Sequence, residues 1–335
     1  MFRRIAIFAC LVWAGSVHAE WLSREEAIMG TAIRVEVWDA DADAGRAAIT
    51  AVMDEMRRID ELMSPYKPAS ELSRINREAG KQAVKISSEQ FDLIVRSLEL
   101  SKLTHGAFDI TFSSVGYLYD YRKRQEPTDA QIAGALPGIN YRHLILDRRA
   151  GTIRFARQGV RIDLGGIAKG HAVDRGIEIL KKRGVKEAIV TAGGDSRVLG
   201  DRRGRPWQVG VRDPRDSKGM VAVIPLINAA ISTSGDYERY FERNGRRVHH
   251  IINPKTGKSS TGVRSVTIIG PDATTTDGMS TSVFVMGVAE GMKLVDSMSG
   301  IDAIIIDDLG KMSFSKSLQQ ITPGDARKPV GASKP

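Results

Sequence analysis

Apolar side chains in the first part of the chain follow two different periods. Alternation predicts a strand over residues 27–38, and a polar loop is expected after the helix that follows it. Residues 90–103 again carry apolar side chains at helical spacing, and 143–146 and 152–155 favour short strands. The helix predicted over 44–62 has an apolar face that carries Ile49, Val52, Met53, Met56 and Ile59.

The middle of the chain reads as strand, glycine turn, helix and strand. A strand is predicted over residues 161–164, followed by Gly165 and Gly166, a helix over 167–183 and a strand over 187–191. Such a unit places a turn directly before the first turn of a helix.

Strands dominate the remainder of the chain. Residues 237–242 and 247–252 flank Asn244-Gly245, a pair that is typical of a tight hairpin. Residues 274–298 are expected to be largely helical, and 323–335 are expected to form a loose tail. Further strands are predicted at 207–211, 221–227, 229–232, 265–269 and 303–306. The pattern as a whole predicts a mixed α+β fold with antiparallel sheets and packed helices, in one domain over residues 20–322.

Residues 1–19 have the pattern of a cleaved signal peptide. Arg3 and Arg4 precede an apolar run over residues 5–13, and Val17-His18-Ala19 supplies the small residues of a cleavage site. We therefore expect an exported, periplasmic protein. The alternatives are a retained anchor at the inner membrane and lipid attachment at Cys10. Cleavage after Ala19 would leave no cysteine, which excludes disulfides, thiolate zinc sites and a cysteine nucleophile.

The charge of the chain narrows the choice of partner only slightly. The formal net charge is +9, but the basic residues are dispersed and no nucleic-acid-binding signature is present, so no nucleic-acid partner is expected. A positive surface would equally attract an anionic cofactor or a membrane-bound partner.

A first candidate site is the glycine turn of residues 163–170, Asp-Leu-Gly-Gly-Ile-Ala-Lys-Gly. Backbone N–H groups and the positive end of a helix favour a phosphate here. Lys169 can add a positive charge, and Gly166 can present its carbonyl to a cation. A plain connection between strand and helix is the alternative, because the motif is neither a Walker nor a Rossmann fingerprint.

A second candidate is the start of the helix at residues 274–281. Asp277 and Thr281 are four residues apart and share one helix face, so that a carboxylate and a hydroxyl can bind one hard cation such as Mg²⁺. Capping of the helix by Thr and Asp explains the same residue types nearly as well.

Two further segments could serve chemistry. In 249–257, strand alternation places His249 and His250 on opposite faces, so that at most one of them is expected at a given site, where an imidazole can act as a base. A surface histidine is the alternative. In 105–111, together with Tyr66 and residues 70–72, loops can hold a flat ring system, although a residue such as Phe108 is more often part of a core.

Taken together and in this order, the motifs closely resemble those of the ApbE family of FAD:protein FMN transferases. The resemblance covers nearly the whole chain after residue 28, and it includes residues 29–31, 63–66, 70–72, 106–111, 163–170, 193–195, 232–235, 250–257 and 277–281. It implies an ApbE-like, T-fold-related architecture. It also implies a Mg²⁺-dependent transfer of FMN from FAD to a Thr or Ser hydroxyl of another protein, with release of AMP.

The resemblance also implies roles for individual residues. His250 would be the catalytic base, and the Mg²⁺ site would consist of the Gly166 carbonyl, Asp277 and Thr281. The flavin site would use Met29, Tyr66, Ala107, Phe108, Asp109, Asp163, Lys169 and Ile252. The sequence departs from the usual pattern at Asn253, which replaces an Asp, at Gly166, where some members have Ala, and at residues 278–279.

Two other functions remain open from the sequence. An FAD pyrophosphatase would use the same groups with water as the nucleophile, and a non-catalytic flavin-binding protein of the cell envelope would bind FAD without turnover. Family resemblance implies a membrane-bound acceptor flavoprotein, such as a subunit of a Na⁺-pumping quinone reductase or an Rnf-type complex, or a nitrous-oxide-reduction regulator.

Overall fold

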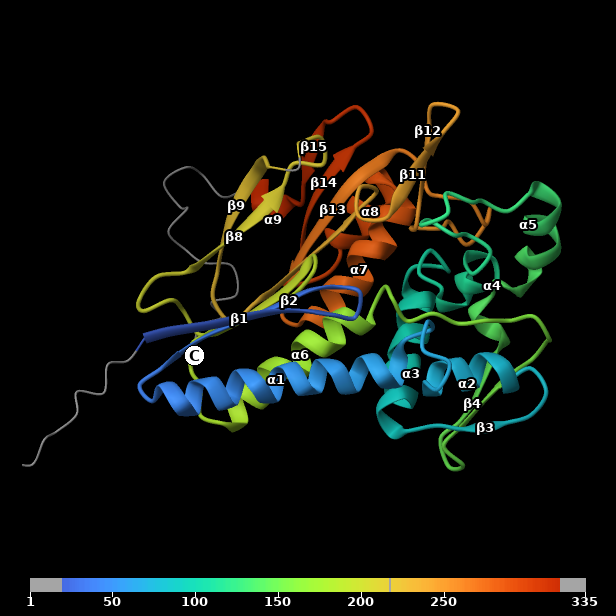
Figure 1. Cartoon of the computed structure of the whole chain (residues 1–335). Helices are drawn as coiled ribbons and strands as arrows, with labels where there is room; N and C mark the ends of the chain where they lie inside the picture. Colours follow the sequence, from blue (N-terminus) through green and yellow to red (C-terminus); the bar gives the residue numbers. More distant parts are fainter. Residues whose placement is uncertain (1–19, 217, 320–335) are drawn as a thin grey trace, which may run out of the picture.

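The computed structural model describes residues 20–216 and 218–319. The expected signal peptide (1–19) and C-terminal tail (323–335) lie outside the described residues. Figure 1 shows a large twisted sheet with helices packed along it and a smaller lobe at one end. The α+β class expected from the sequence is confirmed.

The eight-stranded sheet is antiparallel throughout, with the order β1-β2-β6-β7-β10-β13-β14-β15. Its strands are β1 (Glu20–Ile28), β2 (Thr31–Asp39), β6 (Ala188–Ala192), β7 (Asp195–Leu199), β10 (Ala230–Gly235), β13 (Val263–Gly270), β14 (Asp302–Asp307) and β15 (Met312–Phe314). Strands far apart in the sequence are thus neighbours in space.

The single strand predicted over residues 27–38 is wrong, because the chain reverses within it. Ile28 pairs with Thr31 across a two-residue turn. Met29 (φ 55°) and Gly30 (φ 71°) both adopt left-handed conformations, as a tight hairpin requires. Glycine accepts this conformation without strain, whereas Met29 is held in it by the hairpin.

The helices α1 (Ala42–Met63), α6 (Ala168–Lys182) and α7 (Ala273–Met286) pack on one face of the sheet. The Asp41 side chain caps α1 by accepting hydrogen bonds from two backbone amides. The predicted apolar face of this helix is confirmed, since its five side chains are at most 3% exposed. The opposite face of the sheet packs against the hairpin of β8 (Trp207–Arg212) and β9 (Met220–Leu226) and, at its edge, against α9 (Lys316–Gln319).

The smaller lobe lies beside the ends of α1 and α7 (Figure 1). Its longest helix is α3 (Ser88–Leu103), and a three-stranded sheet has the order β3-β5-β4. The other elements are α2 (Glu71–Glu78), β3 (Val84–Lys85), η1 (Ile110–Phe112), α4 (Ser113–Gly116), α5 (Asp129–Ala135), η2 (Leu136–Gly138), η3 (Tyr141–His143), β4 (Leu144–Asp147) and β5 (Thr152–Phe155). The loop expected after α1 therefore contains a helix, α2.

Two more expectations are corrected. Residues 161–164 form no strand. At Ile162 a side chain takes the place of a neighbouring strand: the Asn76 side-chain amide accepts a hydrogen bond from its N–H (2.7 Å) and donates one to its C=O (2.9 Å). The helix expected over 274–298 is broken at Gly287 (φ 82°) into α7 and α8 (Val288–Val295).

The predicted hairpin around Asn244-Gly245 is confirmed as β11 (Tyr240–Arg243) and β12 (Arg246–His249). In the described part of the chain, no helix combines the length and the apolar character needed to cross a membrane.

Candidate functional site

The site begins at one end of the central strands of the large sheet, where three segments meet. The turn between β6 and β7 lies beside the β1–β2 hairpin, since the Gly193 amide donates to the Ala32 carbonyl (2.9 Å). On its other side, Thr233 of β10 donates to the Gly194 carbonyl (3.0 Å). A side chain at Gly194 would place its Cβ 2.6 Å from the Thr233 carbonyl oxygen, so only glycine allows this approach. Asp195, the first residue of β7, directly follows this turn.

The glycine turn before α6 is shaped by Asp163. Its carboxylate accepts a hydrogen bond from the Gly165 amide (2.7 Å). Burial raises the pKa of Asp163, and that hydrogen bond and the charge of Arg239 oppose the rise. The turn leads to Lys169 and Gly170, which lie in the first turn of α6.

A buried charge centre joins α6, α7 and β7. Lys169 Nζ forms an ion pair with Asp195 and lies 3.6 Å from a carboxylate oxygen of Asp277. Asp277 is 2% exposed, and its other oxygen accepts a hydrogen bond from the Gly170 amide (2.9 Å). Two carboxylates thus share one ammonium group, which leaves the centre with a net negative charge when all three are ionised.

The pKa values of this centre are strongly shifted. Burial first, and the charge of Asp195 second, raise the pKa of Asp277 to about 7. Burial lowers the pKa of Lys169, but the two carboxylates outweigh it and the net shift is upward. Shifts of this kind in a buried cluster are typical of functional sites.

The close approach of α6 and α7 depends on Gly170. A Cβ at this position would lie 2.1 Å from the Ala273 carbonyl oxygen and 2.8 Å from the Asp277 Cβ. Asp174, one turn further along α6, also holds α7. Its carboxylate accepts hydrogen bonds from the amides of Ala273 and Thr274, both at 2.8 Å, and pairs with Arg197 at 2.7 Å.

Hydroxyl groups tie α7 to β10. Ser232 pairs with Thr276 (2.8 Å) and Ser234 with Ser280 (2.7 Å), while Ser234 Oγ also lies 3.3 Å from Thr281 Oγ1. These contacts fix the rotation of α7, so that Asp277 and Thr281 face α6.

The residues expected to hold a metal ion lie together. A Cβ added at Gly166 would be 3.3 Å from Thr281 Oγ1 and 3.3 Å from a ring carbon of Phe108, so the absent side chain leaves room beside the hydroxyl. Asp277 is joined to the same turn of α6 through Gly170. Helix capping does not account for Asp277, because Asp272 is the N-cap of α7.

The donor set fits a hard cation that binds oxygen ligands. Among the residues that the structure describes, no three His, Cys, Asp or Glu side chains are placed to share a metal ion. A cation at this site would therefore combine one carboxylate with neutral protein oxygens and oxygens of the bound substrate, as Mg²⁺ commonly does.

The two adjacent histidines have different environments. His249 is 3% exposed, its Nε2 lies 2.8 Å from the Ser260 carbonyl, and its ring packs edge-on against Phe284. His250 is half-buried, with its amide donating to the Arg239 carbonyl (3.1 Å) and no partner for its buried Nδ1. Burial first, then Arg239, lower the pKa of His250 to about 3, so the ring is uncharged at neutral pH.

The residues expected around the flavin differ in exposure. Phe108 is 3% exposed and borders Gly166, and Ile252 is also buried. Ala107 is half-buried, as is Met29 in the β1–β2 turn. Tyr66 is 79% exposed, so its ring is free to cover a ligand. Its hydroxyl lies within electrostatic range of Asp163 and Arg239.

The Asp109 carboxylate bonds its own loop and the start of η3. One carboxylate oxygen accepts hydrogen bonds from the Thr111 amide (2.8 Å) and hydroxyl (2.6 Å), and the other accepts one from the Tyr141 amide (2.8 Å). Burial raises its pKa, which these bonds oppose. Asn253 behaves similarly, because its side chain accepts from the Lys255 amide (2.9 Å) and so shapes the following turn.

Three residues of the site were given no role by the sequence prediction: Asp195 and Ser234, which lie in the segments 193–195 and 232–235 of the family resemblance, and Arg239, which lies in none of them. The pair Gly193-Gly194 before Asp195 offered a signal, since it marks a turn between strands. Nothing in the sequence marked Arg239, which lies in the segment predicted as a hairpin strand.

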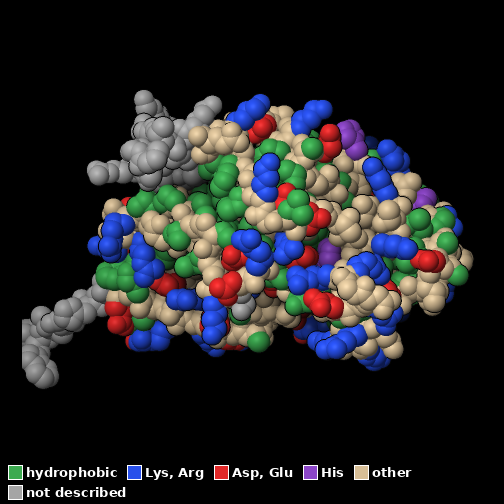
Figure 2. Space-filling view, turned by 90° about the horizontal axis from the view of Figure 1, so that it is seen from above, with side chains coloured by type: hydrophobic (Ala, Val, Ile, Leu, Met, Phe, Trp, Pro, Cys, Tyr) green, Lys and Arg blue, Asp and Glu red, His purple; other side chains and the backbone are tan. Residues whose placement is uncertain are grey.

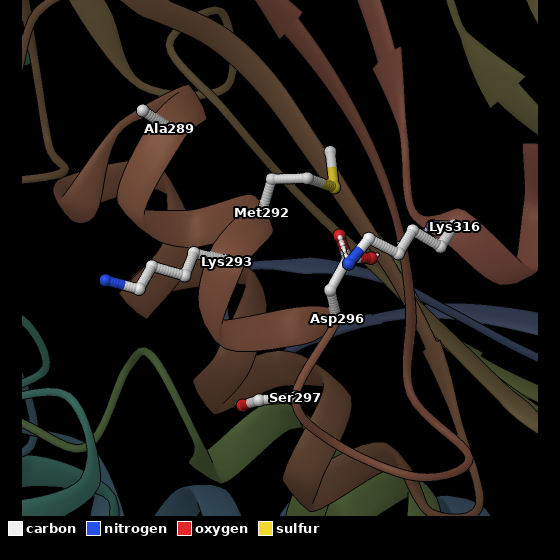
Figure 3. A pocket seen from close by; sticks show the side chains of 6 residues that line it. All are labelled: Ala289, Met292, Lys293, Asp296, Ser297 and Lys316. Atoms are coloured by element: carbon white, nitrogen blue, oxygen red, sulfur yellow. Dashed lines mark hydrogen bonds and ion pairs between the residues drawn. The ribbon is translucent and has the colours of Figure 1, made fainter.

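A separate cavity lies away from these residues. A pocket of about 460 Å³ is lined by residues of α8, the turn after it and α9, among them Lys293, Asp296 and Lys316 (Figure 3). None of the predicted site residues lines it. Lys and Arg side chains are scattered over the face shown in Figure 2. We place the site at the buried charge centre, where ionisable groups with shifted pKa values lie close together.

Several known proteins are similar to this chain over most of its length. A protein named FAD:protein FMN transferase from Treponema pallidum is 30% identical over 332 residues, covering 91% of each chain, and one from Haemophilus influenzae is 32% identical over 306 residues, covering 86% of this chain and 88% of that protein. The ApbE protein of Thermotoga maritima superposes with a TM-score of 0.84 at 34% identity, covering 90% of this chain and 98% of that chain. The flavin transferase ApbE of Vibrio cholerae superposes with a TM-score of 0.80 at 28% identity, covering 90% of this chain and 99% of that chain. The model of the ApbE family matches residues 29–305, and the chain belongs to this family.

Proposed function

We propose that this chain transfers FMN from FAD to a Thr or Ser hydroxyl of an acceptor protein in a Mg²⁺-dependent reaction that releases AMP. The names of the relatives support transfer of FMN. The observation that carries the proposal is the buried Lys169–Asp195–Asp277 centre, which lies on the α6 helix start beside Gly166 and Thr281. A lysine, two carboxylates and neutral oxygens at a helix N-terminus suit a phosphate that is bound together with a cation.

The chain's own groups would bind and orient the diphosphate of FAD. The positive end of α6 and the ammonium group of Lys169, which lies in the first turn of this helix, favour negative charge. Gly166, Asp277 and Thr281 are the residues that would hold Mg²⁺, which when bound would offset the charge that develops on the phosphates. Phe108 and Tyr66 would contact the flavin ring.

His250 would hold the proton that the acceptor loses. The hydroxyl oxygen forms a bond to the phosphorus nearest riboflavin, the bond from this phosphorus to the bridging oxygen breaks, and AMP leaves with the electron pair. The hydroxyl proton passes to a ring nitrogen of His250, which is uncharged and therefore free to accept it. A negative diphosphate near Arg239 would offset one cause of the low His250 pKa and make the ring a better base.

We further propose that the reaction takes place outside the cytoplasm on a membrane-bound flavoprotein. The pattern of residues 1–19 supports export. The exposed Tyr66 beside the site supports a large acceptor, because an acceptor protein needs an open approach to His250 and to the phosphorus.

The test is to incubate the mature protein with FAD, Mg²⁺ and a purified acceptor domain. We expect flavin fluorescence on the acceptor band after denaturing electrophoresis, a mass increase equal to FMN and an equal amount of AMP. Release of free FMN with AMP and no labelled acceptor would instead identify an FAD pyrophosphatase. FAD that binds and remains intact would identify a delivery protein, and either result would overturn the transfer proposal.

A further inference from the structure

Arg239 reaches across the site from the loop between β10 and β11. A Cβ at Gly30 would lie 3.3 Å from its Nη2 atom, so the guanidinium rests against the β1–β2 turn that carries Met29. Its backbone carbonyl accepts the hydrogen bond from the His250 amide at 3.1 Å. Arg239 therefore connects the flavin-side turn to the predicted base.

The charge of Arg239 acts on both sides of the site. It opposes the rise that burial causes in the pKa of Asp163, and it adds to burial in lowering the pKa of His250. It also opposes the upward shift of the Lys169 pKa. The guanidinium therefore lies within electrostatic range of the glycine turn, the charge centre and the base together.

Arg239 differs from Lys169 in having no carboxylate partner. Lys169 is held between Asp195 and Asp277, so most of its charge is already matched. No carboxylate oxygen of the described residues lies within ion-pair distance (4.0 Å) of the Arg239 side chain, which is exposed. A mobile anion entering the site would therefore meet the charge of Arg239 before that of Lys169.

We propose that Arg239 binds the diphosphate of FAD. This substrate-binding residue is not among the site residues that the family resemblance implies. The forked guanidinium can donate two parallel hydrogen bonds to phosphate oxygens. Its position between the Met29 turn and the start of α6 places it where a dinucleotide would pass from flavin to phosphate. The proposal rests on the proposed function, since it takes FAD as the ligand.

The proposal is tested by flavin fluorescence titration of the full mature chain with FAD and with riboflavin, in EDTA so that no metal contributes. Wild-type protein that binds no FAD either in EDTA or with Mg²⁺ added would defeat the proposed function itself. With binding in the wild type, we expect Arg239→Gln to weaken FAD binding about 10- to 100-fold while riboflavin binding stays within about twofold. Arg239→Lys keeps the positive charge but not the forked guanidinium, so its FAD affinity should lie between those of the wild type and Arg239→Gln.

The control is Arg154→Gln, which removes an exposed arginine of β5 that has no carboxylate partner among the described residues. It should leave both affinities unchanged. Equal losses for FAD and riboflavin in Arg239→Gln would show that Arg239 only positions the flavin pocket, and no loss for FAD would show that it does not bind the ligand. If riboflavin binds too weakly to measure, the order of FAD affinities (wild type, Arg239→Lys, Arg239→Gln) decides, and equal affinities overturn the proposal.

Discussion

The charged form of Asp277 lowers the stability of the folded protein. Its folded pKa of about 7 lies above the value of an unfolded aspartate, so the folded state disfavours the charged form at neutral pH. A residue that weakens the empty protein in this way is typical of a binding site, where the ligand recovers the loss.

Replacing Asp277 with Asn should therefore separate activity from stability. We expect Asp277→Asn to lower flavin transfer by about 100-fold or more, because the charged ligand for the cation is lost. Thermal unfolding without metal should occur at an equal or higher temperature, since a buried charge has been removed. Mg²⁺ should raise the unfolding temperature of the wild type and not of the variant.

The matched control is Asp92→Asn, at an exposed aspartate that pairs with Arg148. It should transfer flavin at the wild-type rate. Full activity in Asp277→Asn would rule out the role of Asp277 at the cation. The same holds if Mg²⁺ raises the unfolding temperatures of the wild type and Asp277→Asn equally.

The histidines give the protein a specific acid sensitivity. Burial lowers the pKa values of both His249 and His250, so the folded state binds their protons less readily than the unfolded chain does. Their contribution to stability is complete above the unfolded pKa of about 6.5 and is lost as the pH falls towards the folded values.

Urea unfolding at pH 7.5 and pH 5.0 measures this contribution. We expect the wild type to lose more free energy of unfolding over this interval than His250→Gln, which cannot be protonated. His105→Gln, at an exposed histidine, should behave like the wild type. Identical losses in wild type and His250→Gln would mean that the His250 ring is already solvated in the folded protein.

At the scale of elements, the crossing of α6 and α7 determines whether the site forms. Gly170 touches the α7 backbone, and the nearest atom would lie 2.1 Å from an added Cβ. We expect Gly170→Ala to push the helices apart, destabilise the protein by about 1–3 kcal/mol and lower transfer strongly, because Asp277 loses its bond to the Gly170 amide.

Gly134→Ala is the matched control, since it adds the same methyl group to α5, where no atom lies within 4 Å of the new Cβ. It should keep activity and gain up to about 1 kcal/mol in unfolding free energy from helix propensity. Equal activities in the two variants, measured by flavin transfer alongside denaturant unfolding, would contradict the account of the helix crossing.

Several elements could be predicted because their signals are local. The buried face of α1 follows from its spacing, and the β11–β12 hairpin follows from Asn244-Gly245. The strand predicted at 161–164 failed because both backbone groups of Ile162 bond to the Asn76 side chain, 86 positions away in the sequence, and not to a neighbouring strand. The hairpin turn at Met29-Gly30 was missed because methionine rarely adopts a positive φ, and the neighbouring strands supply the reason.

At the scale of the whole molecule, the sheet order explains the site. Placing β7 next to β10, with α6 and α7 on the same face, brings Gly170 and Asp277 into contact across 107 positions of sequence. The sequence indicated Asp277 and Thr281 as one helix face and Lys169 as part of a phosphate turn. It could not indicate that Asp195 and Arg239 join them, because these contacts depend on which strands are neighbours.

The central claim is that Gly166, Asp277 and Thr281 hold one cation beside the diphosphate of FAD. The most direct test is a crystal structure with FAD and Mn²⁺, in which anomalous scattering locates the metal. We expect one peak within coordination distance of the Gly166 carbonyl, the Asp277 carboxylate and the Thr281 hydroxyl, next to the two phosphates. A metal bound away from these three oxygens, or FAD bound with its diphosphate outside the start of α6, would contradict the account.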